Sequence, residues 1–222
     1  MLYLIGSPIG NLSDITFRAL AILKEVAVVA AEDTRRSSVL LKRFEINKPL
    51  VSFHEHNEAR RTAELVDRMR SGEKVALLTD AGMPSISDPG YRIVRACIEQ
   101  GIRIEVIPGP SAVLTALVGS GLPTDRFYFG GFLPVKSGRR EKELTAALAR
   151  EVTSIYFESP HRIVRSLDTI RNADPTRQVC IARELTKQFE EYRRGEVAEV
   201  FLHYAAHPPK GEITIVISGS NI

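Results

Sequence analysis

The stretch TDAGMPSISDPG, residues 79–90, decides how the rest of the chain is interpreted. It follows the apolar run 74–78 and precedes the helix-like stretch 91–100. Its glycines and prolines exclude the interior of a helix or a strand. Glycines let a backbone approach a ligand, prolines restrict a loop before binding, and the two aspartates offer acceptors. The stretch therefore indicates either a tight strand-to-helix turn or a binding loop.

Apolar runs alternate with segments of helical periodicity along the whole chain. These runs predict strands at residues 2–5, 26–31, 50–53, 74–78, 102–107, 127–132, 153–159, 178–186 and 211–218. Helices are expected between most of them. Such alternation is typical of an α/β protein and predicts a mostly parallel sheet with helices on both faces.

Polar or Gly/Pro-rich loops follow six of the predicted strands. Their sequences are GSPIGN, EDTRR, TDAGMPSISDPG, PGPSA, YFESPHR and ARELTK. In an open α/β sheet the carboxyl ends of the strands share one rim, and such folds bind ligands there. We therefore expect all six loops on one rim, which favours a binding loop at 79–90.

The segment GSGLPTD, residues 119–125, is the predicted domain boundary because it concentrates breakers and has little that could be buried. It separates a first α/β domain, residues 1–118, from a second, residues 126–222. The composition is that of an ordinary globular protein of 222 residues, 44% of them hydrophobic. No apolar run reaches membrane-spanning length and the N-terminus lacks a secretory signal, so we expect a cytoplasmic protein.

Several common sites are not indicated. The chain has neither GxGxxG nor GxxxxGK[ST], which excludes the usual phosphate-binding loops. His54 and His56 flank Glu55, but no third ligand is marked, so we expect no metal. Cys97 and Cys180 lie in apolar patterns and predict buried free thiols. The net charge of +3 neither demands nor excludes nucleic acid, although the basic residues cluster in doublets.

Nine strings, in order along the chain, carry a resemblance to a known family. They are SPIGNLSDIT, AAEDTRRS, FHEHNE, TDAGMPSISDPGYR, PGPSA, SGLPTDRFYFGGFLP, ESPHR, ARELTK and KGEITIV. Together they resemble the small-subunit (16S) ribosomal RNA cytidine 2′-O-methyltransferase family, within the tetrapyrrole methylase superfamily. The similarity runs from Tyr3 to about Ile217. Ser7 and Met83 stand where family members usually carry threonine, and longer members have an additional helical carboxyl-terminal segment.

The resemblance implies two α/β domains of tetrapyrrole-methylase type with S-adenosylmethionine in the cleft between them. It also implies a homodimer acting on 16S rRNA, within an assembled small ribosomal subunit. The family's cofactor contacts fall on Pro8, Asp80, Ala81, Gly82, Ile86, Ser111, Ala112, Phe157, Ala182 and Glu212. A zwitterionic ligand end suits amides at a helix N-terminus, and adenine suits an apolar slot.

The implied reaction is attack of a ribose hydroxyl on a sulfonium methyl group. Alignment of the reactants supplies much of the rate, and a base would add to it. The candidate bases are Asp33, Glu184 and His161. Each could instead be an ion-pair partner of a neighbouring arginine, namely Arg35, Arg183 or Arg162.

RNA contacts are expected from basic and polar side chains on the proposed rim. They are Arg35, Arg36, His54, His56, Asn57, Lys136, Arg139 and Arg140. Residues 80–86 would hold the methyl donor and residues 87–90 would face the RNA, with Asp88 the most exposed. Two alternatives stay open: a small-molecule, tetrapyrrole-like methylase of the same fold, and a non-catalytic RNA-binding protein.

Overall fold

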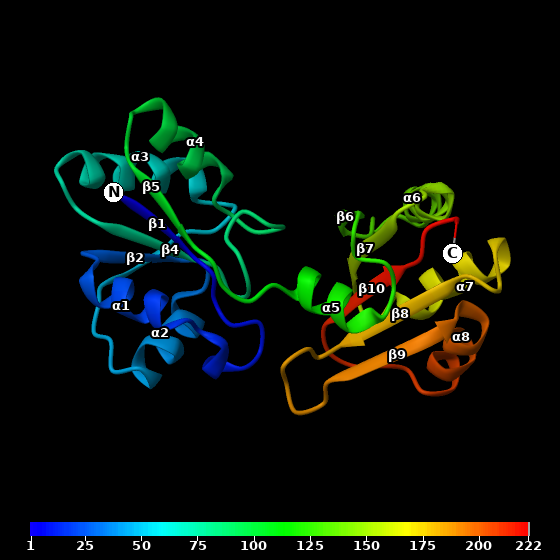
Figure 1. Ribbon diagram of the computed structural model, residues 1–222. Helices are drawn as coiled ribbons and strands as arrows, with labels where there is room; N and C mark the ends of the chain where they lie inside the picture. The colour runs from blue at the N-terminus through cyan, green and yellow to red at the C-terminus, as the bar shows by residue number, and fades with distance from the viewer. Residues whose placement is uncertain (222) are drawn as a thin grey trace. The chain divides into compact units, whose positions relative to one another are not determined.

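The computed structural model describes residues 1–221. The chain divides into two compact units, Met1–Ser111 and Ala112–Ile222 (Figure 1). The division precedes helix α5 (Ala112–Ser120) and so differs from the predicted boundary at 119–125. Helix α5 contacts the strands of the second sheet and buries Val113, Ala116 and Leu117. It therefore belongs to the second unit, where its apolar side chains find their packing partners.

The first unit contains a fully parallel sheet in the order β3-β2-β4-β1-β5. The strands are β1 (Leu2–Ile5), β2 (Val28–Ala31), β3 (Leu50–Ser52), β4 (Val75–Leu78) and β5 (Ile104–Ile107). The three inner strands are buried along their whole length, as short aliphatic runs predict for a parallel sheet. The predicted parallel sheet is confirmed for this unit.

Four helices cover the two faces of this sheet: α1 (Phe17–Glu25), α2 (Thr34–Arg43), α3 (Glu58–Arg70) and α4 (Tyr91–Glu99). Helices α1 and α2 form one core with Tyr3 and Ile5, while α3 and α4 form another with Leu2 and Leu4 (Figure 1). A single 3₁₀ turn, Leu12–Asp14, precedes α1. Helix α1 is capped by Thr16, whose side chain accepts from the Ala19 amide.

The second unit contains a mixed sheet in the order β6-β7-β10-β8-β9. Its strands are β6 (Phe127–Phe132), β7 (Thr153–Glu158), β8 (Gln178–Arg183), β9 (Glu191–Glu196) and β10 (Ile213–Ile217). Only β6 and β7 pair in parallel, so the predicted mostly parallel arrangement is wrong here. Strand β9 was not predicted because EYRRGE lacks an apolar face, a composition that suits an exposed sheet edge.

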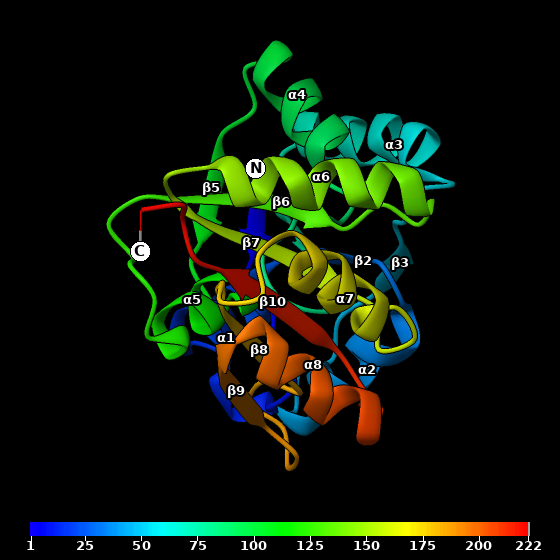
Figure 2. The same ribbon diagram turned by 90° about the vertical axis from the view of Figure 1, so that its right-hand side faces the viewer.

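Helices α6 (Ser137–Ala149), α7 (Ile163–Ala173) and α8 (Val197–Ala206) cover one face of the second sheet (Figure 2). They pack on alternate strand residues, including Ile213, Ile215 and Ile217. Cys97 and Cys180 are buried and unpaired, which confirms their prediction as free thiols. Within residues 1–221, no helix is both long and apolar enough to cross a membrane.

Candidate functional site

Four of the six predicted loops gather at the carboxyl edge of the first sheet. They follow β1, β2, β4 and β5, which all run in the same direction. Neighbouring strands β1 and β4 lead to helices on opposite faces, α1 and α4. This is a topological switch point, where open α/β sheets bind ligands. The other two loops follow β7 and β8 in the second sheet, so the six do not share one sheet edge as predicted.

The loops after β1 and β4 are tied together by their backbones. The Ser7 amide donates to the Gly82 carbonyl at 2.9 Å, and the Gly82 amide donates to the Ser7 carbonyl at 3.1 Å. The buried Ser7 hydroxyl donates to the Thr79 carbonyl at 2.9 Å. A threonine would supply the same hydroxyl, so the serine at this position preserves the contact.

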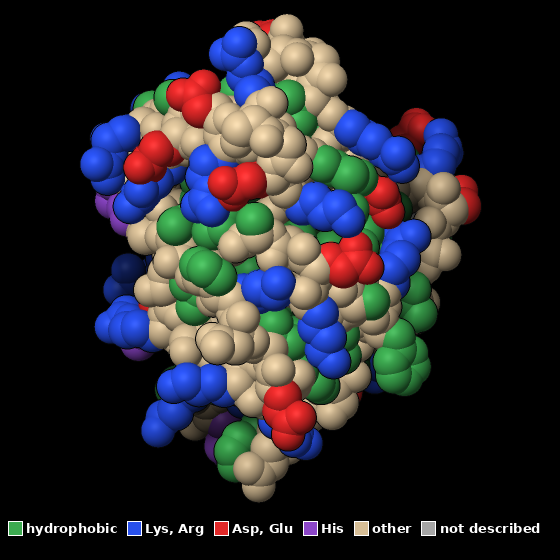
Figure 3. Space-filling model, turned by 90° about the vertical axis from the view of Figure 1, so that its left-hand side faces the viewer, with side chains coloured by type: hydrophobic (Ala, Val, Ile, Leu, Met, Phe, Trp, Pro, Cys, Tyr) green, Lys and Arg blue, Asp and Glu red, His purple; other side chains and the backbone are tan. Residues whose placement is uncertain are grey.

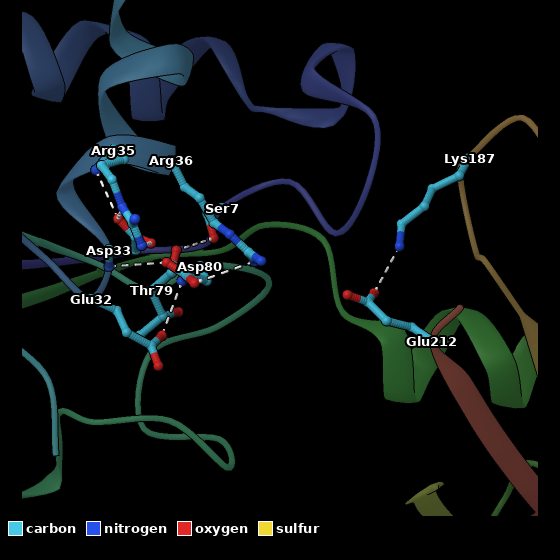
Figure 4. A network of polar contacts seen from close by, with 9 residues as sticks. All are labelled: Ser7, Glu32, Asp33, Arg35, Arg36, Thr79, Asp80, Lys187 and Glu212. Atoms are coloured by element: carbon cyan, nitrogen blue, oxygen red, sulfur yellow. Dashed lines mark hydrogen bonds and ion pairs between the residues drawn. The ribbon is translucent and has the colours of Figure 1, made fainter. Parts of the chain in front are cut away.

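Asp80 joins the loops after β2 and β4 (Figure 4). Its Oδ1 accepts from the Asp33 amide at 3.0 Å, and its own amide donates to Glu32 Oε2 at 3.1 Å. Its Oδ2 pairs with Arg36 Nη1 at 3.3 Å. Oδ1 of Asp80 therefore binds the backbone, while Oδ2 pairs with the long side chain of Arg36, which is 67% exposed.

The remainder of the segment 79–90 has an unusual backbone. Ser85 and Ser87 adopt φ values of 71° and 62°, in the left-handed region that non-glycine residues rarely occupy. The Ser85 amide donates to the Pro89 carbonyl at 3.3 Å, so the loop folds back on itself. The side chain of Ile86 is among the exposed large hydrophobic ones, at 48%. Strained backbone of this kind is typical of binding sites and is held only by surrounding contacts.

Asp88 is half-buried, contrary to the expectation that it would be the loop's most exposed residue. Burial, together with the negative charges of Glu32 and Asp80, raises the pKa of Asp88 to about 7, and the neighbouring Thr79 hydroxyl opposes part of this rise. The loop therefore carries a carboxyl group that changes its protonation near neutral pH.

The loops after β1 and β5 touch through two glycines. A Cβ atom on Gly6 would lie 2.7 Å from the Cα atom of Gly109 and 2.7 Å from the Met83 sulfur. Pro8, a predicted cofactor contact, is buried in the same turn. The sequence therefore requires glycine at both positions to keep β1 and β5 adjacent at this edge.

The second sheet also brings predicted cofactor residues together. Strands β6, β7 and β8 run in the same direction, so the loops after them share an edge with the start of β10. In β10, Thr214 lies between Phe157 of β7 and Ala182 of β8 as the cross-strand partner of both. Cross-strand partners face the same side of a sheet. Thr214 was not among the sequence candidates, because its position between these two residues depends on strand register, which has no sequence signal here.

Asp33 is engaged as a helix cap and an ion-pair partner. It precedes α2, and its Oδ1 accepts from the Arg35 amide at 2.9 Å. The Arg35 guanidinium donates to both carboxylate oxygens, at 3.0 and 2.7 Å. These bonds hold the pKa of Asp33 well below its usual range. The residue is therefore a poor proton acceptor, in agreement with the ion-pair alternative.

Glu184 connects the end of β8 to the start of β10. Its Oε1 accepts from the Glu212 amide and from Lys187 Nζ, both at 2.9 Å. The Glu212 amide and then Lys187 lower the pKa of Glu184. Lys187 is drawn with Glu212 in Figure 4, and its Nζ lies 3.0 Å from Glu212 Oε2. The ion-pair partner of Glu184 is thus Lys187 and not the predicted Arg183, which pairs with Glu191 at 3.0 Å.

His161, the third candidate base, is exposed on the loop after β7. That loop is held by Glu158, whose side chain is fully buried. Glu158 accepts from Arg162 at 2.8 Å, from the Ser159 amide at 2.7 Å and from the Ser166 hydroxyl at 2.6 Å. Arg162 therefore pairs with Glu158 and leaves the imidazole of His161 at the surface.

The predicted RNA contacts differ in exposure. Arg35, Arg36, His56, Lys136 and Arg139 are exposed, and the side of the molecule in Figure 3 shows cationic and anionic side chains interspersed.

The prediction that Arg140 contacts RNA is wrong, because this residue is 6% exposed and its Nη1 donates to the Pro134 and Val135 carbonyls. Asn57 and His54 are half-buried and bond to each other. Among the described residues, no group of three or more His, Cys, Asp or Glu is placed to hold a metal ion.

The structure defines a two-domain α/β protein in which loops gather at a switch point of the first sheet. Residues 1–200 match the family of Tetrapyrrole (Corrin/Porphyrin) Methylases, and the chain belongs to this family. The predicted fold class is thereby confirmed. Two solved structures share the fold: uroporphyrin-III-C-methyltransferase from Thermus thermophilus, with a TM-score of 0.68 at 24% identity, and diphthine synthase, with 0.73 at 16%. The match to uroporphyrin-III-C-methyltransferase covers 99% of this chain and 94% of that protein's chain. The match to diphthine synthase covers 98% of this chain and 89% of that protein's chain.

Curated relatives are more similar in sequence. The protein from Thermotoga maritima is 47% identical over 98% of both chains and is named ribosomal RNA small subunit methyltransferase I. A protein of the same name from Mesorhizobium japonicum is 50% identical over 97% of this chain and 74% of its own. Another, from Halalkalibacterium halodurans, is 46% identical over 99% of this chain and 76% of its own. The resemblance stated from the sequence motifs is thus confirmed.

Proposed function

We propose that the protein transfers the methyl group of S-adenosylmethionine to the ribose 2′-hydroxyl of a cytidine in 16S ribosomal RNA. The observation that carries this proposal is the similarity, over 98% of both chains at 47% identity, to a protein named as a small-subunit ribosomal RNA methyltransferase. The nucleotide and the 2′-oxygen come from the family that the sequence motifs resemble. The clustering of loops at a switch point of the first sheet, where the segment 79–90 lies, supports a ligand site there.

The residues at the first sheet's edge fit the chemistry of the methyl donor. Asp80 Oδ2 offers a partly exposed negative charge to a cationic or hydroxyl group, and Ile86 offers apolar surface. Gly82 has a φ of 78°, and a Cβ atom added to it would lie at ordinary van der Waals distances from its neighbours. We propose Pro8, Ala81, Ser111, Ala112, Phe157, Ala182 and Glu212 as further contacts.

The donor's sulfonium makes its methyl carbon an electrophile, so the protein's main task is alignment of that carbon with the ribose oxygen. An O–C bond forms as the S–C bond breaks, and the hydroxyl proton must leave. Because the carboxylates of Asp33 and Glu184 are hydrogen-bonded and have lowered pKa values, we assign them structural roles. His161 remains the proposed proton acceptor among the three candidates.

RNA binding is proposed for the exposed basic side chains. Arg35, Arg36, His56, Lys136 and Arg139 would contact phosphates, which makes affinity salt-dependent. His54 is proposed to act with His56, whereas Asn57 is engaged in holding the turn. A homodimer, an assembled small subunit as substrate and a cytoplasmic location are part of the same proposal.

Methyl transfer from labelled S-adenosylmethionine tests this function directly. Small ribosomal subunits, free 16S RNA and a porphyrinogen are offered as competing acceptors. We expect label in the RNA, at the 2′-oxygen of a cytidine after nuclease digestion and mapping. Label on the porphyrinogen alone would support the small-molecule alternative. RNA binding without any transfer would support the non-catalytic one.

A further inference from the structure

The first turn of α3 supplies a buried carboxylate to the far end of the segment 79–90. Glu58 is 8% exposed, and its Oε1 accepts from the Gly90 amide at 3.0 Å and from the Arg92 amide at 3.2 Å. Its Oε2 lies 3.6 Å from Arg92 Nε. Gly90 is the N-cap of α4 and has no side chain to accept from the free amides of that helix. Glu58 therefore caps α4 from another helix, with a charge that suits the helix dipole.

The turn before α3 holds Glu58 in place. Asn57 Oδ1 accepts from the His54 amide at 2.9 Å, and Asn57 Nδ2 donates to the Ser52 hydroxyl at 3.1 Å. The Glu58 amide donates to the His54 carbonyl at 2.9 Å. The string HEHNE thus forms a hydrogen-bonded turn at the end of β3 that directs a carboxylate toward α4. This explains Asn57 better than an RNA contact does.

Carboxylates consequently fix both ends of the segment 79–90. Glu32 accepts from the Asp80 amide at one end, and Glu58 accepts from the Gly90 amide at the other. Between these points, Ser85 and Ser87 are in the left-handed region, a conformation that is unfavourable for non-glycine residues and needs support from surrounding contacts. Gly90 itself is packed too closely for a side chain, with a Cβ only 2.5 Å from the Ser85 hydroxyl.

We propose that Glu58 is a positioning residue for methyl-donor binding: by clamping Gly90 and Arg92 it keeps the loop 79–90 in its binding conformation. The inference rests on the proposed function, because it assigns the donor to this loop. It extends that function to a residue on a different helix from any predicted contact. Glu58 acts through the loop backbone.

Calorimetric titration with S-adenosylmethionine and amide hydrogen exchange of residues 83–90 test the proposal together. We expect Glu58→Ala to weaken donor binding roughly tenfold or more, because hydrogen bonds to a charged group are lost, and to speed exchange in the loop. Glu58→Gln keeps an acceptor oxygen and should bind within about threefold of the parent. Glu73→Gln is the matched control, because it weakens an ion pair with Arg68, at 2.6 Å, just beyond the carboxyl end of α3.

Unchanged donor affinity in folded Glu58→Ala would overturn the positioning role, as would an equal loss in Glu73→Gln. If Glu58→Ala does not fold, Glu58→Asp shortens the reach to both amides and allows the same comparison. If the parent protein binds no donor, the proposed function fails first. Loop exchange then judges the clamp alone: faster exchange in Glu58→Ala supports it, and unchanged exchange refutes it.

Discussion

The carboxylate of Asp80 accepts a hydrogen bond from the backbone amide of Asp33 at 3.0 Å. This contact joins the second residue after β4 to the residue that caps α2, although 47 positions separate them in sequence. In the opposite direction, the Glu32 carboxylate accepts a hydrogen bond from the Asp80 amide. The edge of the first sheet is therefore organised by reciprocal bonds between acidic side chains and backbone amides, with Arg36 balancing part of the charge.

Asp80→Ala should abolish or strongly reduce methyl transfer. The substitution leaves the Asp33 amide without its acceptor and removes the partly exposed Oδ2, and loss of a charged hydrogen bond costs about 1.5–3 kcal/mol. We expect donor affinity to fall by about tenfold or more, measured by calorimetry. Asp67→Ala is the control, because Asp67 is exposed on α3 and its carboxylate forms a long 3.8 Å pair with Arg70. Equal donor affinities for the two variants would contradict the role of Asp80.

Asp88→Asn should alter how stability depends on pH. The pKa of Asp88 is raised from 3.8 to about 7, so the folded state retains this proton when the unfolded state has lost it. The protonated carboxyl of Asp88 therefore adds to the stability of the folded state. This contribution is complete at a pH below the pKa of the unfolded state, and it is lost as the pH rises through the pKa of the folded state. The melting temperature of the parent minus that of Asp88→Asn should therefore fall between about pH 4 and pH 7 and then level off. A difference that is constant across this range would show that Asp88 titrates normally.

The sequence predicted the first unit well because its strands carry their own signal. Inner parallel strands are buried on both faces, so β1, β2 and β4 read as continuous aliphatic runs followed by polar loops. In the second unit, the direction of β10 relative to β7 and β8 depends on pairing between distant segments. Alternation of helix and strand does not encode that direction, and the polar edge strand β9 has no apolar pattern at all.

Individual side chains were harder to assign than elements. Arg139 and Arg140 are adjacent and chemically identical, yet only the second faces inward from α6, because helical geometry separates neighbours by about 100°. Nothing in the sequence distinguishes Glu58 from the other charged residues of α3. Its partners, Gly90 and Arg92, are more than thirty residues away, so only the folded chain reveals the cap.

Gly6→Ala should destabilise the first unit. The new Cβ would lie 2.7 Å from the Gly109 Cα atom, and backbone cannot yield as a flexible side chain can. Overpacking of this kind costs about 1–3 kcal/mol. Gly138→Ala is the control, because a Cβ there meets nothing within 4 Å and alanine favours the helix. Chemical denaturation should show a lowered midpoint for Gly6→Ala and an unchanged or raised one for Gly138→Ala; the reverse order would refute the close contact.

Arg139→Ala and Arg140→Ala should separate RNA binding from stability. Arg139 is exposed, so its loss should weaken RNA binding and lower the salt dependence of the affinity by about one phosphate contact without changing the denaturation midpoint. Arg140 is buried and bonds the Pro134 and Val135 carbonyls, so its loss should cost about 1–3 kcal/mol of folding free energy. Filter binding across a salt series and urea denaturation measure the two quantities. If Arg140→Ala lowered the salt dependence while keeping full stability, its burial would not describe the protein in solution, and the arginine would return to the RNA-binding set.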